Sequence, residues 1–491
     1  MKKLIIPKYL TRHMVLFICF LTMGVFFSNC ISKGDIQTET GSEYPIQISK
    51  EYPQYFVTNT GETWIPIATN YLPSRFRDDG DNEAAYELME DYFKKFSENG
   101  GNSMRIWIST APLEIEDTKE GDYNPEKFKR IDKMLELAEK YNIYIKFTLH
   151  HIRSIQPTNE GVAGWSNSTA LATAFQNITE YINTPKGINS YLNRARALAA
   201  RYKDHKQIYC WELWNEMDAL PSSAWPVFTP AVLDSVKKIF PNRLVVQTLG
   251  SLHSKTADMS YQKLFSYKNN DFVSIHRYLD LGVDWGQYEY TKLDIDELVS
   301  TAMDFAHQYV SDRPIVINEI GAVEPNHAGP YKYYRTDKDG MLIHDMIFAP
   351  FFCGAAGTGA MWHWDSYIYR NDLWYHYKRF KNAIEGVDPI KERFKQYMFE
   401  TDGVRCFALG GTTKTIIWGR DSGNNWRTEL EQGIAPQPKN NVIIKLEQLK
   451  NSNYKSAKIY DPWQDHWSSV EINNGQVSIP PFIRSFIILF Q

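Results

Sequence analysis

Residues 208–216 read IYCWELWNE, and residues 314–321 read PIVINEIG. Each is a short apolar run that carries an Asn-Glu pair toward its carboxyl end, which is the pattern of a strand buried in a parallel sheet. A carboxylate at that position must be paired or face a polar cavity, because an isolated buried charge is costly. Two further Asn-Glu pairs, at residues 82–83 and 159–160, stand in polar surroundings typical of the surface. The two apolar stretches therefore single out Glu216 and Glu319.

The same rhythm of short β-branched or aromatic runs and longer amphipathic segments fills about three hundred residues. After a hairpin-like start at residues 55–62, eight strands are predicted, at residues 64–70, 102–109, 144–150, 208–216, 244–251, 271–278, 314–321 and 359–365. Helices are predicted at residues 83–99, 125–141, 188–203, 231–240 and 295–310. Eight such units predict an α/β fold of the closed (β/α)8 TIM barrel type. No Gly-x-Gly-x-x-Gly motif follows the first strand, so a dinucleotide-binding fold has no support.

The rhythm changes near residue 387. Short strand-like runs follow from about residue 405 to the end, with a hairpin turn at residues 473–475. We expect residues 44–387 to form the catalytic barrel and residues 388–491 to form an antiparallel β-sandwich accessory domain. This second domain could bind carbohydrate or buttress the barrel. We favour the buttress, because Trp418, Trp463 and Trp467 alone do not make an evident aromatic platform.

The N-terminus has the composition of an export signal. Four basic residues precede an apolar stretch at residues 14–27, which is too short to span a bilayer comfortably. The segment resembles a bacterial lipoprotein signal in which Cys30 is lipidated, although Phe27 and Asn29 depart from the usual pattern. We expect residues 1–30 to be the signal, residues 31–43 to be a polar tether, and the protein to be an exported lipoprotein at the outer membrane of a Gram-negative bacterium. A short uncleaved membrane anchor is the alternative.

Composition excludes several classes of protein. With 43% hydrophobic residues, 23% charged residues and a net charge of -4, the chain is globular and has no electrostatic signature of nucleic-acid binding. The partners that we expect are a membrane, which the lipid anchor would bind, and a substrate. Three cysteines, Cys210, Cys353 and Cys406, lie far apart without metal-type spacing, so we expect buried free thiols.

The ordered set of strand-end residues resembles clan A of the glycoside hydrolases, most closely family 5, over residues 64–365. The resemblance implies that Glu216 is the general acid/base and Glu319 the nucleophile. It implies substrate-binding roles for six more positions: Arg105, His150, Asn215, His276, Tyr278 and Trp362. Two choices stay open, because His151 adjoins His150 and because Trp364 shares a strand face with Trp362.

These residue types suit the hydrolysis of an acetal. Such a reaction needs a proton donor for the departing oxygen and a negative charge beneath the developing oxocarbenium ion. We expect Glu319 to be ionised and hydrogen-bonded by Arg105 and Tyr278, and burial to raise the pKa of Glu216. Asn215 can hold the 2-hydroxyl group of the sugar. The structural alternative is that both glutamates are salt-bridged to arginines of the barrel.

No cofactor is implied, and no metal site is expected, because His150 and His151 lack further ligands at suitable spacing. Long aromatic loops after the third, seventh and eighth strands favour a β-linked oligo- or polysaccharide substrate, of the β-mannan or β-glucan type. The same loops could instead enclose one chain end, as in an exo-acting β-mannosidase or β-glucosidase. A transglycosylase and a non-catalytic glycan-binding lipoprotein are the remaining alternatives.

Overall fold

The computed structural model describes residues 44–155, 167–220, 225–281, 291–450 and 453–491. Ser42–Gln491 form one compact unit. The predicted signal with Cys30, the tether and the loop residue Trp165 lie outside the described residues. Within the described part of the chain, every helix is too short or too polar to cross a membrane.

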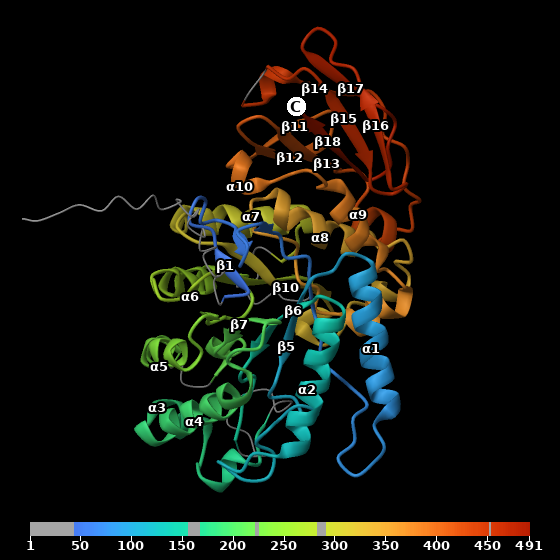
Figure 1. Ribbon diagram of the computed structural model, residues 1–491. Helices are drawn as coiled ribbons and strands as arrows, with labels where there is room; N and C mark the ends of the chain where they lie inside the picture. The colour runs from blue at the N-terminus through green and yellow to red at the C-terminus, as the bar shows by residue number, and fades with distance from the viewer. Residues whose placement is uncertain (1–43, 156–166, 221–224, 282–290, 451–452) are drawn as a thin grey trace, which may run out of the picture. The chain divides into compact units, whose positions relative to one another are not determined.

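Parallel strands surrounded by helices make up the first three quarters of the described chain (Figure 1). One set pairs in the order β4 (Ala68–Asn70), β5 (Ser103–Trp107), β6 (Tyr144–Thr148), β7 (Ile208–Glu212) and β8 (Leu244–Val246), and a second pairs β9 (Val273–Asp280) with β10 (Ile315–Val323). The helices between or after them are α1 (Glu83–Glu98), α2 (Pro125–Lys140), α3 (Ile178–Asn183), α4 (Pro185–Tyr202), α5 (Trp225–Ile239), α6 (Lys255–Phe265), α7 (Ile295–Tyr309), α8 (Met341–Phe352), α9 (Tyr375–Ala383) and α10 (Pro389–Glu392). The predicted strand-helix alternation is therefore present.

Met361 connects the two sets of parallel strands. It forms parallel bridges with Thr69 in β4 and with Ile320 in β10. On the other side, the amide of Asp271 donates to the carbonyl of Val245 at 3.2 Å. The regular eighth strand predicted for residues 359–365 is wrong, because Met361 forms only these two isolated bridges and a π-helix begins at Trp364.

An antiparallel sheet of β1 (Ile46–Ile48), β2 (Phe56–Thr58) and β3 (Thr63–Trp64) precedes the parallel strands. The strand predicted for residues 64–70 is thus divided into β3 and β4. Pro66 lies at the break and has no N–H to donate. The side chain of Asn102 substitutes for ladder bonds there: it accepts from the amide of Ile67 at 2.8 Å and donates to the carbonyl of Ile65 at 3.0 Å.

Helices α2 and α8 illustrate two kinds of burial. In α2, which the sequence predicted, Pro125 occupies the first turn and the side chain of Asn124 accepts from the amide of Glu126. Helix α8 is buried on every side, so it has no apolar stripe, and the sequence analysis missed it. It contacts α7, α9 and β10 as well as strands of the C-terminal sheet.

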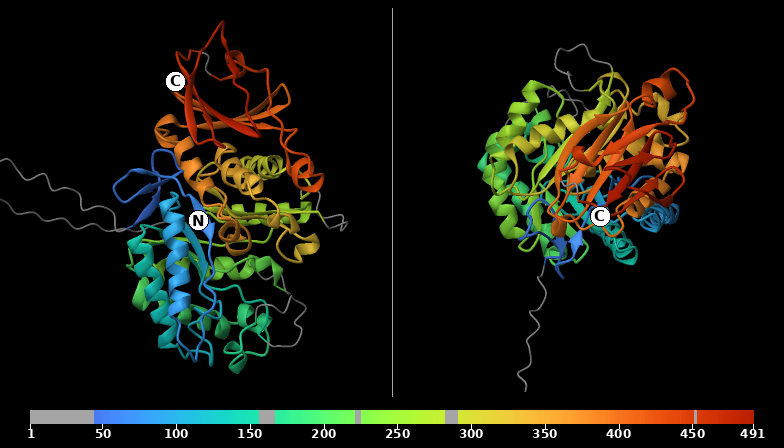
Figure 2. Two further views of the ribbon diagram at one scale, coloured as in Figure 1. Left: turned by 90° about the vertical axis from the view of Figure 1, so that its right-hand side faces the viewer. Right: turned by 90° about the horizontal axis from the view of Figure 1, so that it is seen from above.

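The C-terminal region holds a six-stranded antiparallel sheet and a two-stranded sheet (Figure 2). The larger has the order β11 (Lys395–Thr401), β12 (Val404–Gly410), β13 (Thr415–Asp421), β18 (Ser485–Phe490), β15 (Ala457–Asp461) and β16 (His466–Val470), and the smaller pairs β14 (Val442–Lys445) with β17 (Gln476–Ile479). Phe407 on one face of the larger sheet belongs to the core of the parallel unit, whereas Cys406 on the other face packs with β14 and β17.

Ion pairs between buried side chains tie the larger sheet to the helices. Arg420 in β13 binds Asp345 in α8 through two hydrogen bonds of 2.8 and 3.0 Å. Both faces of the sheet are therefore occupied by packing, which agrees with a buttressing role. The boundary at residue 388 stays a prediction.

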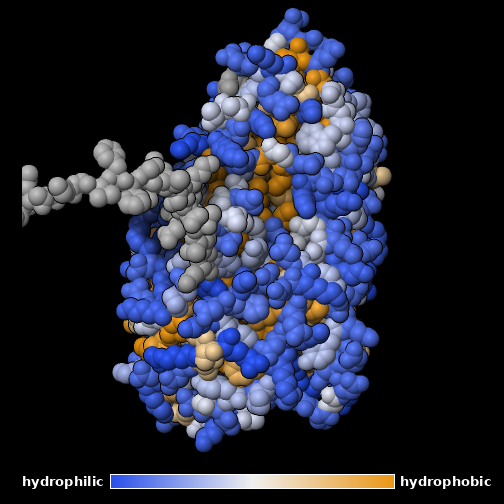
Figure 3. Space-filling view, in the orientation of Figure 1, coloured by the Kyte–Doolittle hydropathy of each residue, from blue (hydrophilic) through white to orange (hydrophobic). Residues whose placement is uncertain are grey.

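Hydrophilic side chains cover most of the face seen in Figure 3, and the apolar colour shows chiefly in hollows.

Cys210, Cys353 and Cys406 are buried free thiols, which confirms the expectation from their spacing. Burial raises the pKa of each of these three thiols, so none has the character of a reactive nucleophile.

Candidate active site

Two carboxylates meet at the carboxyl ends of the parallel strands. Glu319 lies in β10, and Glu216 follows β7 by four residues. Three atoms lie within 4.8 Å of one another: one carboxylate oxygen of Glu216, one of Glu319, and a ring nitrogen of His276 from β9. This separation matches the short class of carboxyl pairs, in which one group attacks directly, and excludes the wide class that leaves room for a water.

A bulge in β10 directs two consecutive side chains inward. The register with β9 shifts between Ile317 and Glu319, so Asn318 is the additional residue. Asn318 and Glu319 are both buried. In a regular strand they would face opposite sides of the sheet, and bulges commonly re-aim side chains beside active sites.

Glu319 is held by hydrogen-bond donors on both oxygens. Arg105 Nη1 binds Oε1, and the hydroxyl of Tyr278 donates to Oε2 at 2.8 Å. His276 Nδ1 lies 3.5 Å from the same Oε2. These contacts place Arg105 and Tyr278 against Glu319, where the sequence analysis expected them.

Arg105 is fixed by a second carboxylate beneath it, that of Glu212. Its Nε and Nη2 donate to the two oxygens of Glu212 at 2.8 and 2.5 Å. Nη2 also donates to Asn215 Oδ1 at 2.7 Å. Because the carbonyl oxygen of Asn215 is engaged by Arg105, its Nδ2 group remains to donate toward a ligand. The contact of Asn215 with a sugar hydroxyl stays a prediction.

Glu216 has a different environment from Glu319. His276 Nδ1 lies 2.8 Å from Oε1, and Arg153 Nη2 donates to Oε2 at 3.0 Å. The backbone of Glu216 is left-handed, with φ of 48°, which costs a non-glycine residue about 1–3 kcal/mol. Arg153 also donates to the backbone carbonyl of Glu216 and so supports this conformation.

The expected rise in the pKa of Glu216 is not found in the unliganded protein. Burial does raise it, but the hydrogen bond and electrostatic attraction of His276, together with the electrostatic attraction of Arg153 and His327, outweigh burial, and the net shift of the pKa is downward. The free protein therefore favours the carboxylate form.

Two of the predicted substrate contacts are fully buried. His150 packs among Tyr181, Tyr191 and Trp214 and has no exposed surface. His276 is also fully buried, and its Nδ1 faces Glu216 and Glu319. Direct contact of either histidine with a substrate stays a prediction.

Trp362 is half-buried and continues a row of rings. Its ring lies 4.7 Å from that of Trp107, which in turn stacks on His151 at 4.7 Å. Trp364 packs edge-on against Trp362 at 5.3 Å. Of the two adjacent histidines, His151 is therefore the one that contacts this row of rings. Of the two tryptophans, Trp362 contacts Trp107 directly and Trp364 contacts Trp362.

Several polar residues of the site were missed: the charged Glu212, Lys146 and Arg153, and the neutral Asn318. Lys146 Nζ lies 3.0 Å from Glu212 Oε2, and both side chains are buried. A signal was present: Lys146 stands inside the apolar run YIKFT, and Glu212 inside IYCWE. A charge within a buried strand requires a partner of opposite sign, so these two could have been paired.

Glu216, His276 and Glu319 form the one group within the described ranges whose ligand atoms approach closely enough for a metal ion. Each already has protein partners, and the three are the groups that acid/base chemistry needs. We therefore expect activity to be unchanged in EDTA, measured as kcat/KM on the same glycoside before and after dialysis against the chelator. Loss of activity that a divalent ion restores would contradict this expectation.

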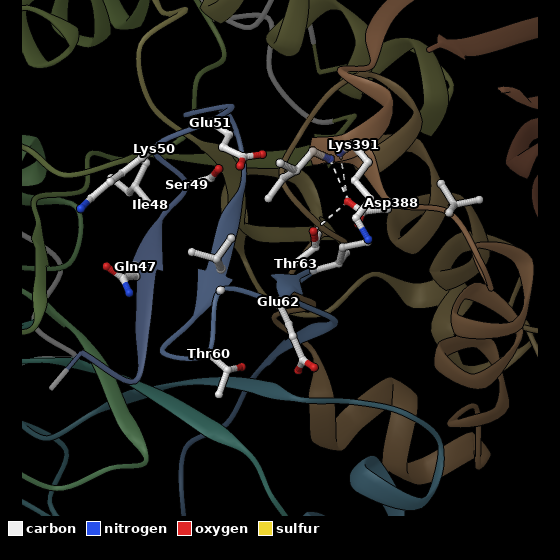
Figure 4. A pocket seen from close by; sticks show the side chains of 15 residues that line it. Gln47, Ile48, Ser49, Lys50, Glu51, Thr60, Glu62, Thr63, Asp388 and Lys391 are labelled. Carbon is white, nitrogen blue, oxygen red and sulfur yellow. Dashed lines mark hydrogen bonds and ion pairs between the residues drawn. The ribbon is translucent and has the colours of Figure 1, made fainter. Parts of the chain in front are cut away.

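A cavity of about 690 Å³ lies away from this site, between β1 to β3 and residues 387–391 (Figure 4). Thr63 donates to Asp388 Oδ1 at 2.8 Å within it. The side chains of Glu51 and Glu62 stand apart in Figure 4 and form no facing pair. The cavity therefore lacks the paired carboxylates that distinguish the cleft at the strand ends.

Known proteins resemble this chain in sequence and in fold. A probable mannan endo-1,4-beta-mannosidase F from Aspergillus oryzae is 23% identical over 269 residues, which are 49% of this chain and 52% of that protein. The chain thus spans about half the length of this curated relative. A solved structure described as a glycoside hydrolase has a TM-score of 0.58 at 12% identity and covers 91% of this chain and 97% of its own.

A glycoside hydrolase family 5 structure from Bacteroides vulgatus has the same TM-score of 0.58, at 13% identity, and covers 91% of this chain and 94% of its own. At such identities the two structures show a shared fold. The family profile described as Cellulase (glycosyl hydrolase family 5) matches residues 74–347, which is more than half of the 491 residues and includes both glutamates of the cleft. The chain belongs to glycosyl hydrolase family 5.

Proposed function

We propose that this protein is a retaining β-glycoside hydrolase with Glu319 as nucleophile and Glu216 as acid/base. The single observation that carries the proposal is the approach of their oxygens to within 4.8 Å at the strand ends. Membership of the family supports it. The proposal includes a closed (β/α)8 barrel, for which the bridges of Met361 to both neighbouring strands are the support.

The first step forms a covalent intermediate. Glu319 Oε attacks the anomeric carbon, the glycosidic C–O bond breaks, and the departing oxygen takes the proton of Glu216. Arg105 and Tyr278 hold Glu319 charged and aimed until the attack. The positive charge of Arg105 also limits the build-up of negative charge where Glu212, Glu319 and the substrate oxygens converge.

The second step releases the sugar. A water molecule takes the place of the leaving group and gives a proton to the Glu216 carboxylate, while its oxygen attacks the anomeric carbon and the ester bond to Glu319 breaks. Two displacements restore the original configuration. The downward shift of the pKa of Glu216 suits this base role.

The substrate class we favour is a β-linked mannan, ahead of a β-glucan. The curated relative, a probable mannan endo-1,4-beta-mannosidase, supports this order. A panel of β-linked glycans tests it: we expect hydrolysis of β-mannan, with oligosaccharides from mannohexaose and the β-anomer as the first product. Release of monosaccharide alone would assign exo action, and inactivity on every glycan would overturn the proposal.

Export and attachment to a membrane through lipidated Cys30 remain part of the proposal and rest on the sequence of residues 1–30. Metabolic labelling with a radioactive fatty acid tests them. Wild-type protein should take up label and the Cys30→Ser variant should not, whereas label in both or in neither would exclude lipidation at Cys30.

A further inference from the structure

We propose that Asn318, oriented by Lys146 and Glu212, fixes His276 in the tautomer whose proton is on Nδ1, so that His276 donates to Glu216. This inference rests in part on the proposed function, because its consequence for catalysis requires Glu216 to be the acid/base. Asn318 and Lys146 are then positioning residues that act through His276.

The orientation of the Asn318 amide is set by two charges of opposite sign. Lys146 Nζ lies 2.9 Å from Asn318 Oδ1, and Glu212 Oε2 lies 3.4 Å from Asn318 Nδ2. Turning the amide over would place its N–H groups against the ammonium and its carbonyl against the carboxylate. Both contacts would be repulsive at buried positions, so only one orientation satisfies them.

The charge on Lys146 follows from its own contacts. Its Nζ faces three acceptors, Glu212 Oε2 at 3.0 Å, Asn318 Oδ1 at 2.9 Å and Ser274 Oγ at 3.2 Å. An ammonium group has three N–H donors and no lone pair, and the three acceptors match them. Burial lowers the pKa of Lys146, and the carboxylate of Glu212 opposes that shift. With three acceptors matching its three N–H groups, Lys146 donates to Asn318 Oδ1.

The orientation of the amide decides the proton on His276. Asn318 Nδ2 lies 3.2 Å from His276 Nε2, and because Nδ2 is a donor, Nε2 must accept. A neutral imidazole that accepts at Nε2 carries its proton at Nδ1. That nitrogen lies 2.8 Å from Glu216 Oε1, so the ring donates to the carboxylate.

Among the residues that the structure describes, the other groups around the ring do not compete for Nε2. Glu319 faces Nδ1 at 3.5 Å, and the hydroxyl of Tyr261 meets the backbone amide of His276. The remaining charges bear on Glu216: Arg153 and His327 favour its ionised form, while Asp218 is an acidic neighbour. The tautomer is thus controlled by Asn318 and, through it, by Lys146 and Glu212.

The bulge in β10 makes this arrangement possible. It allows Asn318 to point inward beside Glu319, where β6, β7 and β9 contribute Lys146, Glu212 and His276. One strand therefore supplies both the nucleophile and the residue that orients the partner of the acid/base. This juxtaposition gives the buried Lys146 and Glu212 a function beyond charge balance.

The direct test is the tautomer of His276 in protein labelled with ¹⁵N-histidine. Long-range ¹H–¹⁵N NMR distinguishes protonated from unprotonated ring nitrogens, and the spectrum of His276→Gln identifies the signal among the 12 histidines. We expect Nδ1 protonated and Nε2 unprotonated in the wild type. A proton on Nε2 would overturn the proposal, and this measurement needs neither a substrate nor an altered Asn318.

In Asn318→Asp, the group that faces His276 Nε2 becomes an ionised carboxylate, which can only accept a hydrogen bond. We expect Nε2 to become protonated, kcat/KM to fall about 10- to 100-fold, and the alkaline limb of the pH profile to move to higher pH, because Glu216 loses its donor. Asn193→Asp, an exposed change on α4 with the same added charge, should alter none of these. An unprotonated Nε2 in Asn318→Asp would refute the role of Asn318.

The measurements distinguish the control of the His276 tautomer from the acid/base role of Glu216. A switch of the tautomer without movement of the alkaline limb would uphold the control of His276 and reject Glu216 as the acid/base. Lys146→Met supplies a second variant: with the ammonium removed, the amide is held by Glu212 alone, and we expect a mixture of tautomers. A wild-type tautomer in Lys146→Met would exclude Lys146 from the mechanism.

Discussion

Replacing Glu319 with alanine should lower kcat on an aryl β-glycoside by roughly 10⁴- to 10⁶-fold, the range seen when a catalytic nucleophile or its base is removed. The reason is that Glu319, held on its two oxygens by Arg105 and Tyr278, is the carboxylate that we propose attacks the sugar. Without it, no group of the protein can form the covalent intermediate, and the oxocarbenium ion loses the charge beneath it.

Rescue with azide identifies the role and not only the importance of Glu319. In Glu319→Ala the azide ion occupies the vacated side of the sugar, so attack should give the α-glycosyl azide from a β-glycoside. Glu319→Gln is the matched variant that preserves shape, because the hydroxyl of Tyr278 can accept from the new amide. It should be folded and should not be rescued.

Glu83→Ala is the control for removing a glutamate. Glu83 also follows an asparagine, but it is exposed at the first turn of α1. Its replacement should leave kcat unchanged within about twofold, since surface substitutions act weakly. Near-wild-type activity in Glu319→Ala, or formation of the β-azide, would remove Glu319 from the nucleophile position.

The sequence was sufficient to place the groups at the strand ends. Glu216, Glu319, Arg105 and Tyr278 each close or approach the end of an apolar run, and parallel strands bring those ends together. The amphipathic helices were predictable for the same reason, since one face is apolar. Helix α8 was not, because a helix buried on all sides has no periodic contrast.

Interactions between distant strands were beyond the sequence. Lys146 and Glu212 signal a need for partners, yet nothing in the spacing says that Asn318 joins them. The bulge that turns Asn318 inward is a shift of one residue in register, and alternation alone would have placed it on the opposite face from Glu319. The pKa of Glu216 depends on the same contacts, which is why burial alone predicted the wrong direction.

Replacing Glu216 with alanine should produce a different pattern of losses from Glu319→Ala. Activity on natural glycans, whose leaving groups need a proton, should fall by roughly 10⁴-fold or more. Formation of the covalent intermediate from a dinitrophenyl glycoside, whose leaving group needs none, should survive, so a burst followed by slow turnover is expected. Azide should accelerate turnover and give the β-glycosyl azide, because it attacks from the side that the leaving group has left.

Alanine is the better replacement at this position, in contrast to Glu319. Both oxygens of Glu216 receive donors, His276 Nδ1 on Oε1 and Arg153 Nη2 on Oε2, so a glutamine amide would face a donor in either orientation. Glu216→Gln should therefore disturb His276 as well as remove the acid, which would mix two effects.

The dependence of activity on pH tests whether Glu216 acts as the acid. Acid catalysis requires protonated Glu216, so activity is lost as pH rises through the pKa of that group in the substrate complex, and Glu216→Ala should lack this alkaline limb. Because the contacts of the free protein lower the pKa of Glu216, the limb for kcat should lie above the limb for kcat/KM. An alkaline limb that persists in Glu216→Ala would assign it to another group, and the α-azide from this variant would reverse the roles of the two glutamates.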